Sequence, residues 1–315
     1  MGFFASLINS MPSAVAQGLI WGIMAIGVYL TYRILDVADL TVDGSLGTGG
    51  AVCVVMVLNG APVGLALLAA TAAGMLAGLV TGLFHTACGI PAILAGILTQ
   101  LALYSVNLRI MGFGTGGGKA NLPISVDKYS LLVSARYVRN VALNNPILIL
   151  AVFCVVLIAV LYWFFGTELG CSLRATGANQ NMARAQGINT NVTTVLGLMI
   201  SNGLVALAGG LLAQYQGFSD INMGRGAIVI GLAAVIIGEV IFSRIFRNFA
   251  LKLLSAVIGA IIYYIVMVFV LRLGLSTDDL KLLTALVVAL FLTIPYWKGK
   301  YFTKTSVKKG EKNHA

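Results

Sequence analysis

Three aspartates near the start of the chain have the clearest potential for chemistry. They lie in the polar stretch RILDVADLTVDGS, residues 33–45, which stands between two apolar runs. If this stretch is helical, the spacing i, i+3, i+7 places Asp36, Asp39 and Asp43 on one face. Carboxylates are costly in hydrocarbon, so this face must meet water, a cation or another polar group.

Two interpretations of the stretch remain open. One is a broken helix whose unwound backbone and carboxylates form a wall of a translocation path. The other is a solvated connector in which Arg33 forms an ion pair with one of the aspartates. Under the first interpretation, the candidate path residues are polar side chains of this stretch and one asparagine from a later apolar run: Asp36, Asp39, Thr41, Asp43, Ser45 and Asn202.

A second polar segment, 166–191, interrupts the chain between two uncharged apolar runs. It reads GTELGCSLRATGANQNMARAQGINTN. A segment this polar must face water or another protein. We predict that Gly170 and Gly177 break the chain and that a short helix over 178–186 ends at Gly187.

This predicted helix has the pattern of an amphipathic element on the membrane surface. Met182 and Ala185 are three residues apart and can share one apolar face, while Arg174 and Arg184 present charge outward. Such an element, held between two spans, suits force transfer to a soluble partner. An ordinary solvated loop is the alternative.

Other chemistries find little support in the residues. The glycine-rich segment 112–119 looks like a phosphate loop, but Phe113 and Ala120 stand where glycine and Ser or Thr are required. The two histidines, His85 and His314, have no catalytic or ligating pattern around them. The four cysteines lack CxxC or Cys/His spacing. We therefore predict no enzyme activity, no bound cofactor and no metal site.

The composition indicates an integral membrane protein. Of the 315 residues, 59% are hydrophobic and 10% are charged, with a mean hydropathy of +0.97, whereas soluble domains carry about 25% charged residues. The start of the chain lacks the basic leader and cleavage site of a signal peptide, so the first apolar run is expected to be retained. No composition shift marks a soluble domain, so we expect one transmembrane domain over 1–315.

Apolar runs long enough to span, or nearly span, a bilayer recur along the chain. They predict an all-α polytopic bundle of about 8–10 transmembrane helices, including a broken or re-entrant early segment. The candidate runs are 13–32, 46–58, 62–84, 90–108, 146–165, 193–213, 227–242, 249–271 and 280–296.

The basic residues orient these spans. The net charge is +10, and six of the twenty Lys and Arg lie in the tail 298–315, which suits anionic lipid and a cytosolic end rather than nucleic acid. Counting spans back from the tail places 166–191 and 243–248 in the cytosol, and 111–145 and 214–226 outside. The same count places the N-terminus outside, unless a re-entrant break in 33–44 changes the parity.

Small residues and one acid within the spans suggest packing roles. Gly74, Gly78 and Gly82 form a ridge at helix-packing spacing, which favours close contact inside one subunit, with a dimer seam as the alternative. Glu239 stands close to the cytosolic end of its run. We interpret it as a structural salt bridge or helix cap rather than a proton relay.

Short motifs in a fixed order resemble one family. The segment 166–191 looks like the cytosolic coupling segment of ABC-importer permeases of the branched-chain amino-acid and ribose type. The match covers Gly170, Arg174-Ala175, Ala183 and Gly187-Ile188-Asn189; 38–45 is similar to a pattern of the sugar branch, and the Ala-Gly-Gly of the following span also matches. The resemblance extends from Val28 to Thr293. Glu239 departs from it by replacing the second glycine of a usual Gly-Gly pair.

The resemblance implies partners that composition cannot reach. Two permeases, as a homodimer or a heterodimer, would form the pore, a cytosolic ATPase dimer would bind ATP and dock on the coupling segments, and an extracytoplasmic binding protein would deliver solute. It implies a bacterial inner-membrane location and, through a tryptophan- or tyrosine-type group, favours an amino acid over a sugar. The expected ATPase contacts are Gly170, Arg174, Ala175, Gly177, Asn179, Ala183, Arg184 and Gly187.

A rival class is an ion-coupled secondary transporter. It predicts inverted repeats with buried acids at matching positions in both halves. Acids occur at 36–43, but Glu239 is a poor counterpart in the second half. A membrane scaffold or membrane enzyme would need a soluble domain or a catalytic cluster.

Overall fold

The computed structural model is a bundle of long helices. It describes residues 3–114, 117–125, 128–129, 131–138, 145–242, 245–246, 248–272 and seven positions between 282 and 293. The predicted span 280–296 lies almost wholly outside the described residues, and the predicted cytosolic tail 298–315 lies outside them altogether. The elements are α1 (Phe3–Tyr29), the π-helix η1 (Leu30–Leu35), α2 (Val42–Leu58), α3 (Val63–Thr86), α4 (Ala92–Met111), β1 (Asn121–Pro123), the 3₁₀ turn η2 (Ala135–Tyr137), α5 (Pro146–Phe165), α6 (Glu168–Ala178), α7 (Gln180–Ala185), α8 (Thr190–Gln216), β2 (Phe218–Asp220), α9 (Ala227–Phe242) and α10 (Phe249–Arg272).

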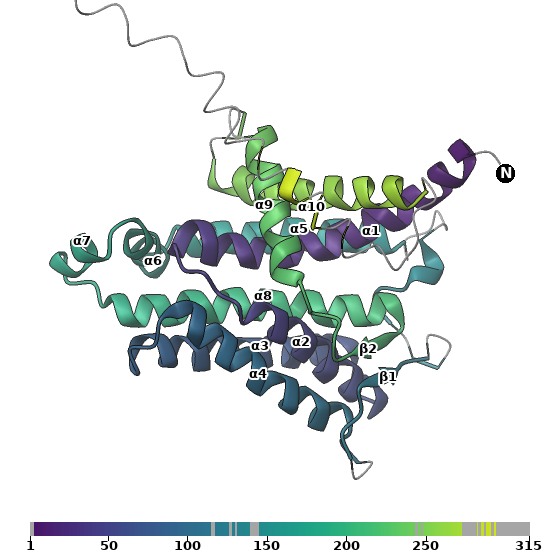
Figure 1. The fold of residues 1–315 in the computed structure, drawn as a ribbon, viewed down its shortest axis with the longest axis horizontal. Helices are drawn as coiled ribbons and strands as arrows, with labels where there is room; N and C mark the ends of the chain where they lie inside the picture. The colour runs from purple at the N-terminus through teal and green to yellow at the C-terminus, as the bar shows by residue number, and fades with distance from the viewer. Residues whose placement is uncertain are drawn as a thin grey trace, which may run out of the picture.

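Among the residues that the structure describes, six helical segments are long and apolar enough to cross a membrane. They are Leu7–Leu35, α3, α4, α5, α8 and α10, while α2 and α9 are shorter apolar helices. The predicted all-α polytopic class is confirmed, and the predicted runs coincide with these helices to within a few residues at most ends. The long helices run between two ends of the molecule (Figure 1). One, the α6–α7 end, carries those two short helices, and the other, the β1–β2 end, carries the strands and the N-terminus.

The strands were not anticipated. β1 pairs antiparallel with β2, with Leu122 opposite Ser219. The pairing joins the two segments that the span count assigned to one side, 111–145 and 214–226, and so confirms that they share a side. The start of α1 lies at this same end (Figure 1), and the chain does break within 33–44, the case in which the count left the side of the N-terminus open.

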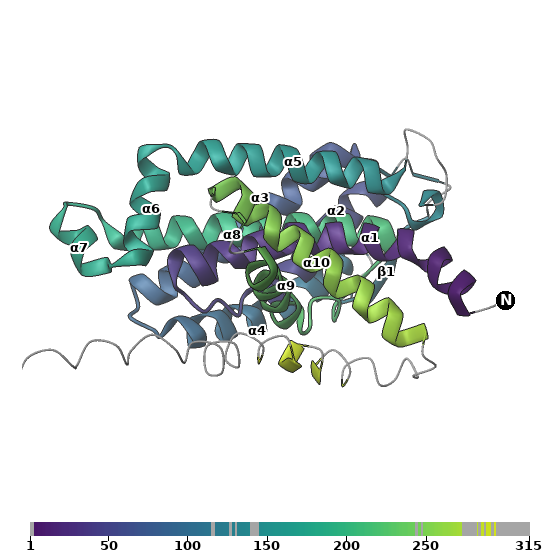
Figure 2. The same ribbon diagram turned by 90° about the horizontal axis from the view of Figure 1, so that it is seen from above.

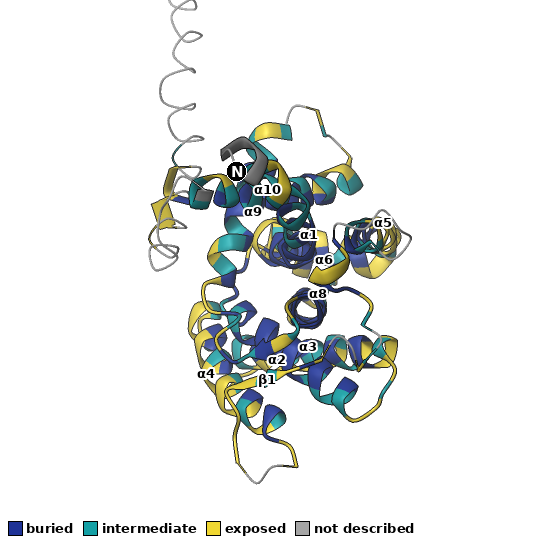
Figure 3. Cartoon of the chain, turned by 90° about the vertical axis from the view of Figure 1, so that its right-hand side faces the viewer, coloured by how far each residue is buried: buried dark blue, intermediate teal, exposed yellow. Residues whose placement is uncertain are grey.

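Helix α8 lies at the centre of the bundle. Viewed along the bundle, it is enclosed by α1, α2 and α3, whereas α4 and α5 lie at the periphery and carry many exposed residues (Figure 3). The predicted glycine ridge of α3 packs here, because a Cβ added at Gly74 or Gly78 would overlap the backbone of α8 at Asn202 or Leu198. Close packing within one chain, the first of the two interpretations, is therefore confirmed.

Helix α10 packs obliquely across α1 on the side opposite α4. In the view from above, α10 crosses α1 diagonally, and α5 runs along the edge of the bundle opposite α4 (Figure 2). A Cβ at Gly18 would overlap the backbone of α10 at Ile261, so a small residue on α1 permits this approach. In this arrangement the C-terminal ends of α1 and α9 and the N-terminal end of α10 come together beside α6.

Candidate translocation and coupling sites

The chain breaks between α1 and α2 at the predicted aspartates. Helix α1 loosens into η1, which ends at Asp36 in the left-handed conformation (φ 54°). Residues 37–40 are not helical. The prediction that Asp36, Asp39 and Asp43 share one helical face is therefore wrong, because the left-handed residue turns the chain out of the helix. The predicted broken helix is correct.

The three carboxylates have different surroundings. Asp36 is exposed, Asp39 is only 3% exposed, and Asp43 is half-buried in the first turn of α2. Asp39 accepts a hydrogen bond from the Thr41 N–H at 2.9 Å and another from Asn202 Nδ2 at 2.6 Å. A carboxylate that is removed from water needs hydrogen-bond donors in the protein, and these two groups supply them.

Asn202 joins the break to the centre of the bundle. It lies near the middle of α8, and its Oδ1 accepts a hydrogen bond from Ser45 Oγ at 2.6 Å. A second chain of hydroxyls links Thr41 to Thr81 of α3 at 2.7 Å and Thr81 to Thr99 of α4 at 2.9 Å. The structure thus brings together four predicted path residues, Asp39, Thr41, Ser45 and Asn202.

Asp43 stabilises the start of another helix. Its carboxylate accepts hydrogen bonds from the N–H groups of Gly226 and Ile228, each at 2.9 Å, at the first turn of α9. A carboxylate at this position satisfies orphan donors and complements the helix dipole. The short helices α2 and α9 therefore begin beside each other, an arrangement typical of discontinuous helices around a transported solute.

The coupling segment forms two short helices. Thr167 Oγ1 accepts from the Gly170 N–H at the start of α6, and Asn179 Oδ1 accepts from the Met182 N–H at the start of α7. Gly170 and Gly177 lie inside α6, so the prediction that they break the chain is wrong. The break falls at Asn179, whose backbone is extended (φ −162°, ψ 105°). Gly187, with φ 81°, follows α7 as predicted.

The face predicted for Met182 and Ala185 does not pack against the rest of the bundle. Met182 is 64% exposed and Ala185 is exposed, whereas Ala183 is buried. Gly170 is buried against the backbone of Phe164 and Phe165. The candidate contact residues that are exposed are Arg174, Ala175, Asn179, Arg184 and Gly187, while Gly177 is partly buried.

Gly177 connects this segment to the break. A Cβ added there would overlap the carbonyl of Ile34 in η1, so α6 rests directly on the π-helix that leads into Asp36. Leu35 in turn packs against Gly197 of α8. The coupling helices therefore contact the segment that positions Asp39 and Asn202.

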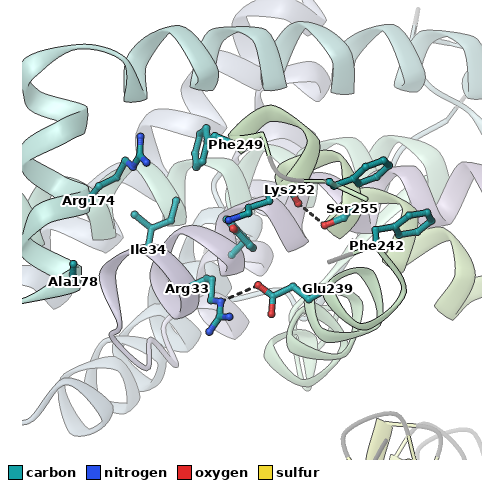
Figure 4. A pocket seen from close by; sticks show the side chains of 12 residues that line it. Arg33, Ile34, Arg174, Ala178, Glu239, Phe242, Phe249, Lys252 and Ser255 are labelled. Carbon is teal, nitrogen blue, oxygen red and sulfur yellow. Dashed lines mark hydrogen bonds and ion pairs between the residues drawn. The ribbon is translucent and has the colours of Figure 1, made fainter. Parts of the chain in front are cut away.

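A cavity of about 460 Å³ opens beside this contact (Figure 4). Arg33 Nε donates to Glu239 Oε1 at 2.9 Å, so the alternative in which Arg33 pairs with an aspartate is wrong. The structural salt bridge predicted for Glu239 is confirmed. Arg174 lies 5.5 Å from the Phe249 ring centroid, a cation–π distance. The polar and charged wall is completed by Lys252 and Ser255, which the sequence did not single out.

Within the described residues, no group of three or more His, Cys, Asp and Glu side chains could hold a metal ion. What the site offers instead is a buried hydrogen-bonded break, two half-length helices and an exposed pair of short helices resting on the break. These features define a polytopic membrane protein of the transporter class.

Residues 10–294 match the sequence profile of a family described as "Branched-chain amino acid transport system / permease component". The chain belongs to this permease family. It is 41% identical over 284 residues to a tyrosine transport system permease protein of Clostridioides difficile, covering 90% of each chain. It is 37% identical to the uncharacterized protein RP368 of Rickettsia prowazekii, covering 90% of this chain and 97% of that one.

More distant similarities agree with the fold. The autoinducer 2 import system permease protein LsrC of Salmonella paratyphi B is 27% identical over 74% of this chain and 64% of its own length. A chain of PsaBC from Streptococcus pneumoniae, solved in complex with a Fab, superposes with a TM-score of 0.51. That match covers 95% of this chain and 98% of the other at 16% identity, so it shows the fold alone.

Proposed function

We propose that this chain is the transmembrane subunit of an ATP-driven ABC importer for an amino acid. The observation that carries the proposal is the contact between α6 and η1 at Gly177 and Ile34. It gives the exposed coupling helices a direct mechanical connection to the polar break at Asp39, Ser45 and Asn202. Movement of one would change the other without a soluble intermediary.

The partners follow from the class. A cytosolic ATPase dimer would bind ATP and dock on α6 and α7, chiefly at Arg174, Asn179 and Gly187, because these three residues are exposed. A second permease, most simply another copy of this chain, would complete the pore in the bacterial inner membrane, and an extracytoplasmic binding protein would deliver the solute. This chain itself would hold no cofactor. Closure of the ATPases would favour one state of the pore by differential contact at α6 and α7.

The solute is proposed from relatives. The similarity to a tyrosine transport system permease supports an amino acid, with tyrosine as the first probe. A sugar-like solute is the second candidate, because the autoinducer 2 import permease is also similar, although more distantly. Uptake of labelled tyrosine and ribose by the reconstituted transporter with its binding protein separates the two.

The test of coupling is a double variant with a matched control. Arg174→Ala with Gly187→Ala removes an exposed cation and strains a left-handed turn at the α6–α7 end. The control, Arg109→Ala with Gly60→Ala, makes the same two changes away from α6 and α7, since Arg109 is exposed and Gly60 has φ 85°.

We expect the Arg174/Gly187 variant to insert normally and to lose solute-stimulated ATPase activity at least tenfold, while the control retains it. Retained stimulation in the first variant would rule out docking at this segment. Uptake that continues without ATP, driven by an ion gradient, would replace the importer class by a secondary transporter.

A further inference from the structure

A second cavity lies where α2 and α9 begin. It has a volume of about 290 Å³ and is bounded by α2, α4 and the loop before α9. This volume is close to the lower limit for small-molecule sites, about 300 Å³. Its polar lining comes from three separate parts of the chain: Asp43, Gln100, Tyr104, Asn107 and Arg225.

Asn107, which lines this cavity, has an amide oxygen without a hydrogen-bond partner in the described structure. The side chain is 2% exposed, and its Nδ2 donates to the Gly44 carbonyl at 3.4 Å. Its Oδ1 has no hydrogen-bond partner among the described residues. If the amide were flipped, Oδ1 would face the Gly44 carbonyl oxygen and the Nδ2 hydrogens would have no acceptor. The side chain would therefore still lack a hydrogen-bond partner. A buried acceptor without a donor is unfavourable, and a bound N–H group would correct it.

Arg225 contributes a positively charged hydrogen-bond donor to the lining of the cavity. Its guanidinium lies 5.9 Å from the ring centroid of Tyr104, and no carboxylate lies within ion-pair distance of it in the described part of the chain. Tyr104 stands seven residues before Met111, the last residue of α4, which is roughly 10 Å along the helix axis from that end. A cation at that depth must face a polar cavity or a partner group. The guanidinium is therefore available for an anion.

Asp43 completes the polarity of the cavity. Its carboxylate accepts the Gly226 and Ile228 N–H groups, but each oxygen retains capacity for a further donor. The residues that line the cavity thus combine a guanidinium, a carboxylate and an amide oxygen without a partner within the residues described. A neutral polyol would leave the guanidinium uncompensated, whereas a zwitterion would satisfy both groups.

We propose that this cavity holds a zwitterionic α-amino acid during its passage through the permease. Arg225 binds the α-carboxylate, for which the guanidinium fork is suited. Asn107 Oδ1 accepts a hydrogen bond from the ammonium group, and Asp43 adds attraction for its charge. The ring of Tyr104 packs against the solute side chain. This inference rests on the proposed import of an amino acid and adds the residues that recognise it.

The test is ATP-driven uptake of tyrosine by the complete transporter in proteoliposomes with saturating, solute-loaded binding protein. We expect Arg225→Met to lower the maximal uptake rate at least tenfold, because the carboxylate loses its counter-charge. The KM should change less, since affinity for free solute belongs to the binding protein. Arg225→Lys should recover part of the rate, because it keeps the charge without the fork. Arg109→Met, an exposed arginine of α4 outside the cavity, is the control and should match the wild type.

The variant Asn107→Leu distinguishes a role of Asn107 in binding the solute from a role in stabilising the fold. Because the substitution removes an unpaired buried group, the thermal midpoint of the assembled transporter should stay level or rise, while uptake falls at least fivefold. A falling midpoint with unchanged uptake would mean that Asn107 serves packing alone and would count against the proposal. Should Arg225→Met fail to assemble with the ATPase, the reduced rate of Arg225→Lys decides the same question.

The outcomes distinguish the two proposals. If the wild type imports tyrosine or another amino acid and Arg225→Met does so equally well, the subsite is wrong and the importer stands. An equal loss in Arg225→Met and Arg109→Met would also overturn the subsite, since the effect would then follow from loss of any cation. If the wild type imports none of the twenty amino acids, the proposed function fails and the subsite fails with it.

Discussion

At the scale of single residues, Asp39 is the most deeply buried of the three early carboxylates. It is buried and accepts hydrogen bonds from Thr41 and from Asn202 of α8. Hydrogen bonds to a charged group contribute about 1.5–3 kcal/mol each. Asp39→Asn keeps the size of the side chain but sets an amide group against donors, so the break should lose its fixed position relative to α8.

We expect Asp39→Asn to lower the maximal uptake rate at least fivefold while co-purification with the ATPase is unchanged. Asp36→Asn is the matched control, because Asp36 is exposed and stands only three residues away. Uptake by Asp36→Asn should equal that of the wild type. Wild-type uptake by Asp39→Asn would favour a connector without a role in the path.

The sequence predicts some of these residues and not others for a clear reason. Asp39, Ser45 and Asn202 stand out because polar groups are rare in apolar runs, and the structure joins all three. Thr81 and Thr99 look like ordinary helix residues, since a hydroxyl can bond its own helix. Arg225 lies in a polar loop beside glycines, where an arginine is unremarkable. Only the packing of that loop against α4 reveals its cavity.

At the scale of elements, the contact of α6 with η1 determines how the coupling helices can act. Gly177→Ala would place a methyl group on the Ile34 carbonyl, so α6 or η1 must shift. We expect solute-stimulated ATPase activity and uptake to fall at least fivefold, with normal membrane insertion. Ala178→Ser, a change of similar size at the exposed neighbour, should leave both near wild type. Equal behaviour of the two variants would show that this contact does not carry coupling.

Glycine explains why this element was mispredicted. A glycine in a polar segment fits either a chain break or a close approach between backbones, and the sequence contains no information on the approaching partner. Gly170 and Gly177 belong to the second case, with Phe164 and Ile34 as their partners. The actual break at Asn179 is of the kind that asparagine favours, because its side chain caps the next helix.

At the scale of the whole molecule, the sequence does not predict which distant segments pair with each other. The helical runs follow from hydropathy, since each span needs about 20 apolar residues. The pairing of β1 with β2 and of Arg33 with Glu239 joins segments far apart in the chain, which no local pattern specifies. The short run at 227–242 was predicted as a span, but its start against Asp43 was not.

The Arg33–Glu239 ion pair joins η1 to α9 in the wall of the first cavity. Because the side chains are 58% and 28% exposed, the pair should contribute only about 0–1 kcal/mol to stability. Arg33→Glu and Glu239→Arg should each place like charges together and slow uptake several-fold, with little change in thermal midpoint. The double swap should restore at least half of the wild-type rate. If the double variant is as slow as the singles, the pairing itself is not what matters.

The two ends of the bundle must face opposite sides of the membrane if α6 and α7 meet an ATPase. Single cysteines test this after the two exposed native thiols, Cys88 and Cys171, are replaced by alanine. Asn179→Cys lies at the tip of the α6–α7 end, and Asn121→Cys lies in β1; both positions are exposed. A membrane-impermeant maleimide added to intact cells should label Asn121→Cys only, and inside-out vesicles should reverse the pattern. Added ATPase should then slow labelling of Asn179→Cys in the vesicles and leave Asn121→Cys unaffected. Labelling of both cysteines from one side would contradict the spanning arrangement, and labelling of Asn179→Cys from outside alone would invert the orientation and exclude a cytosolic ATPase at this end.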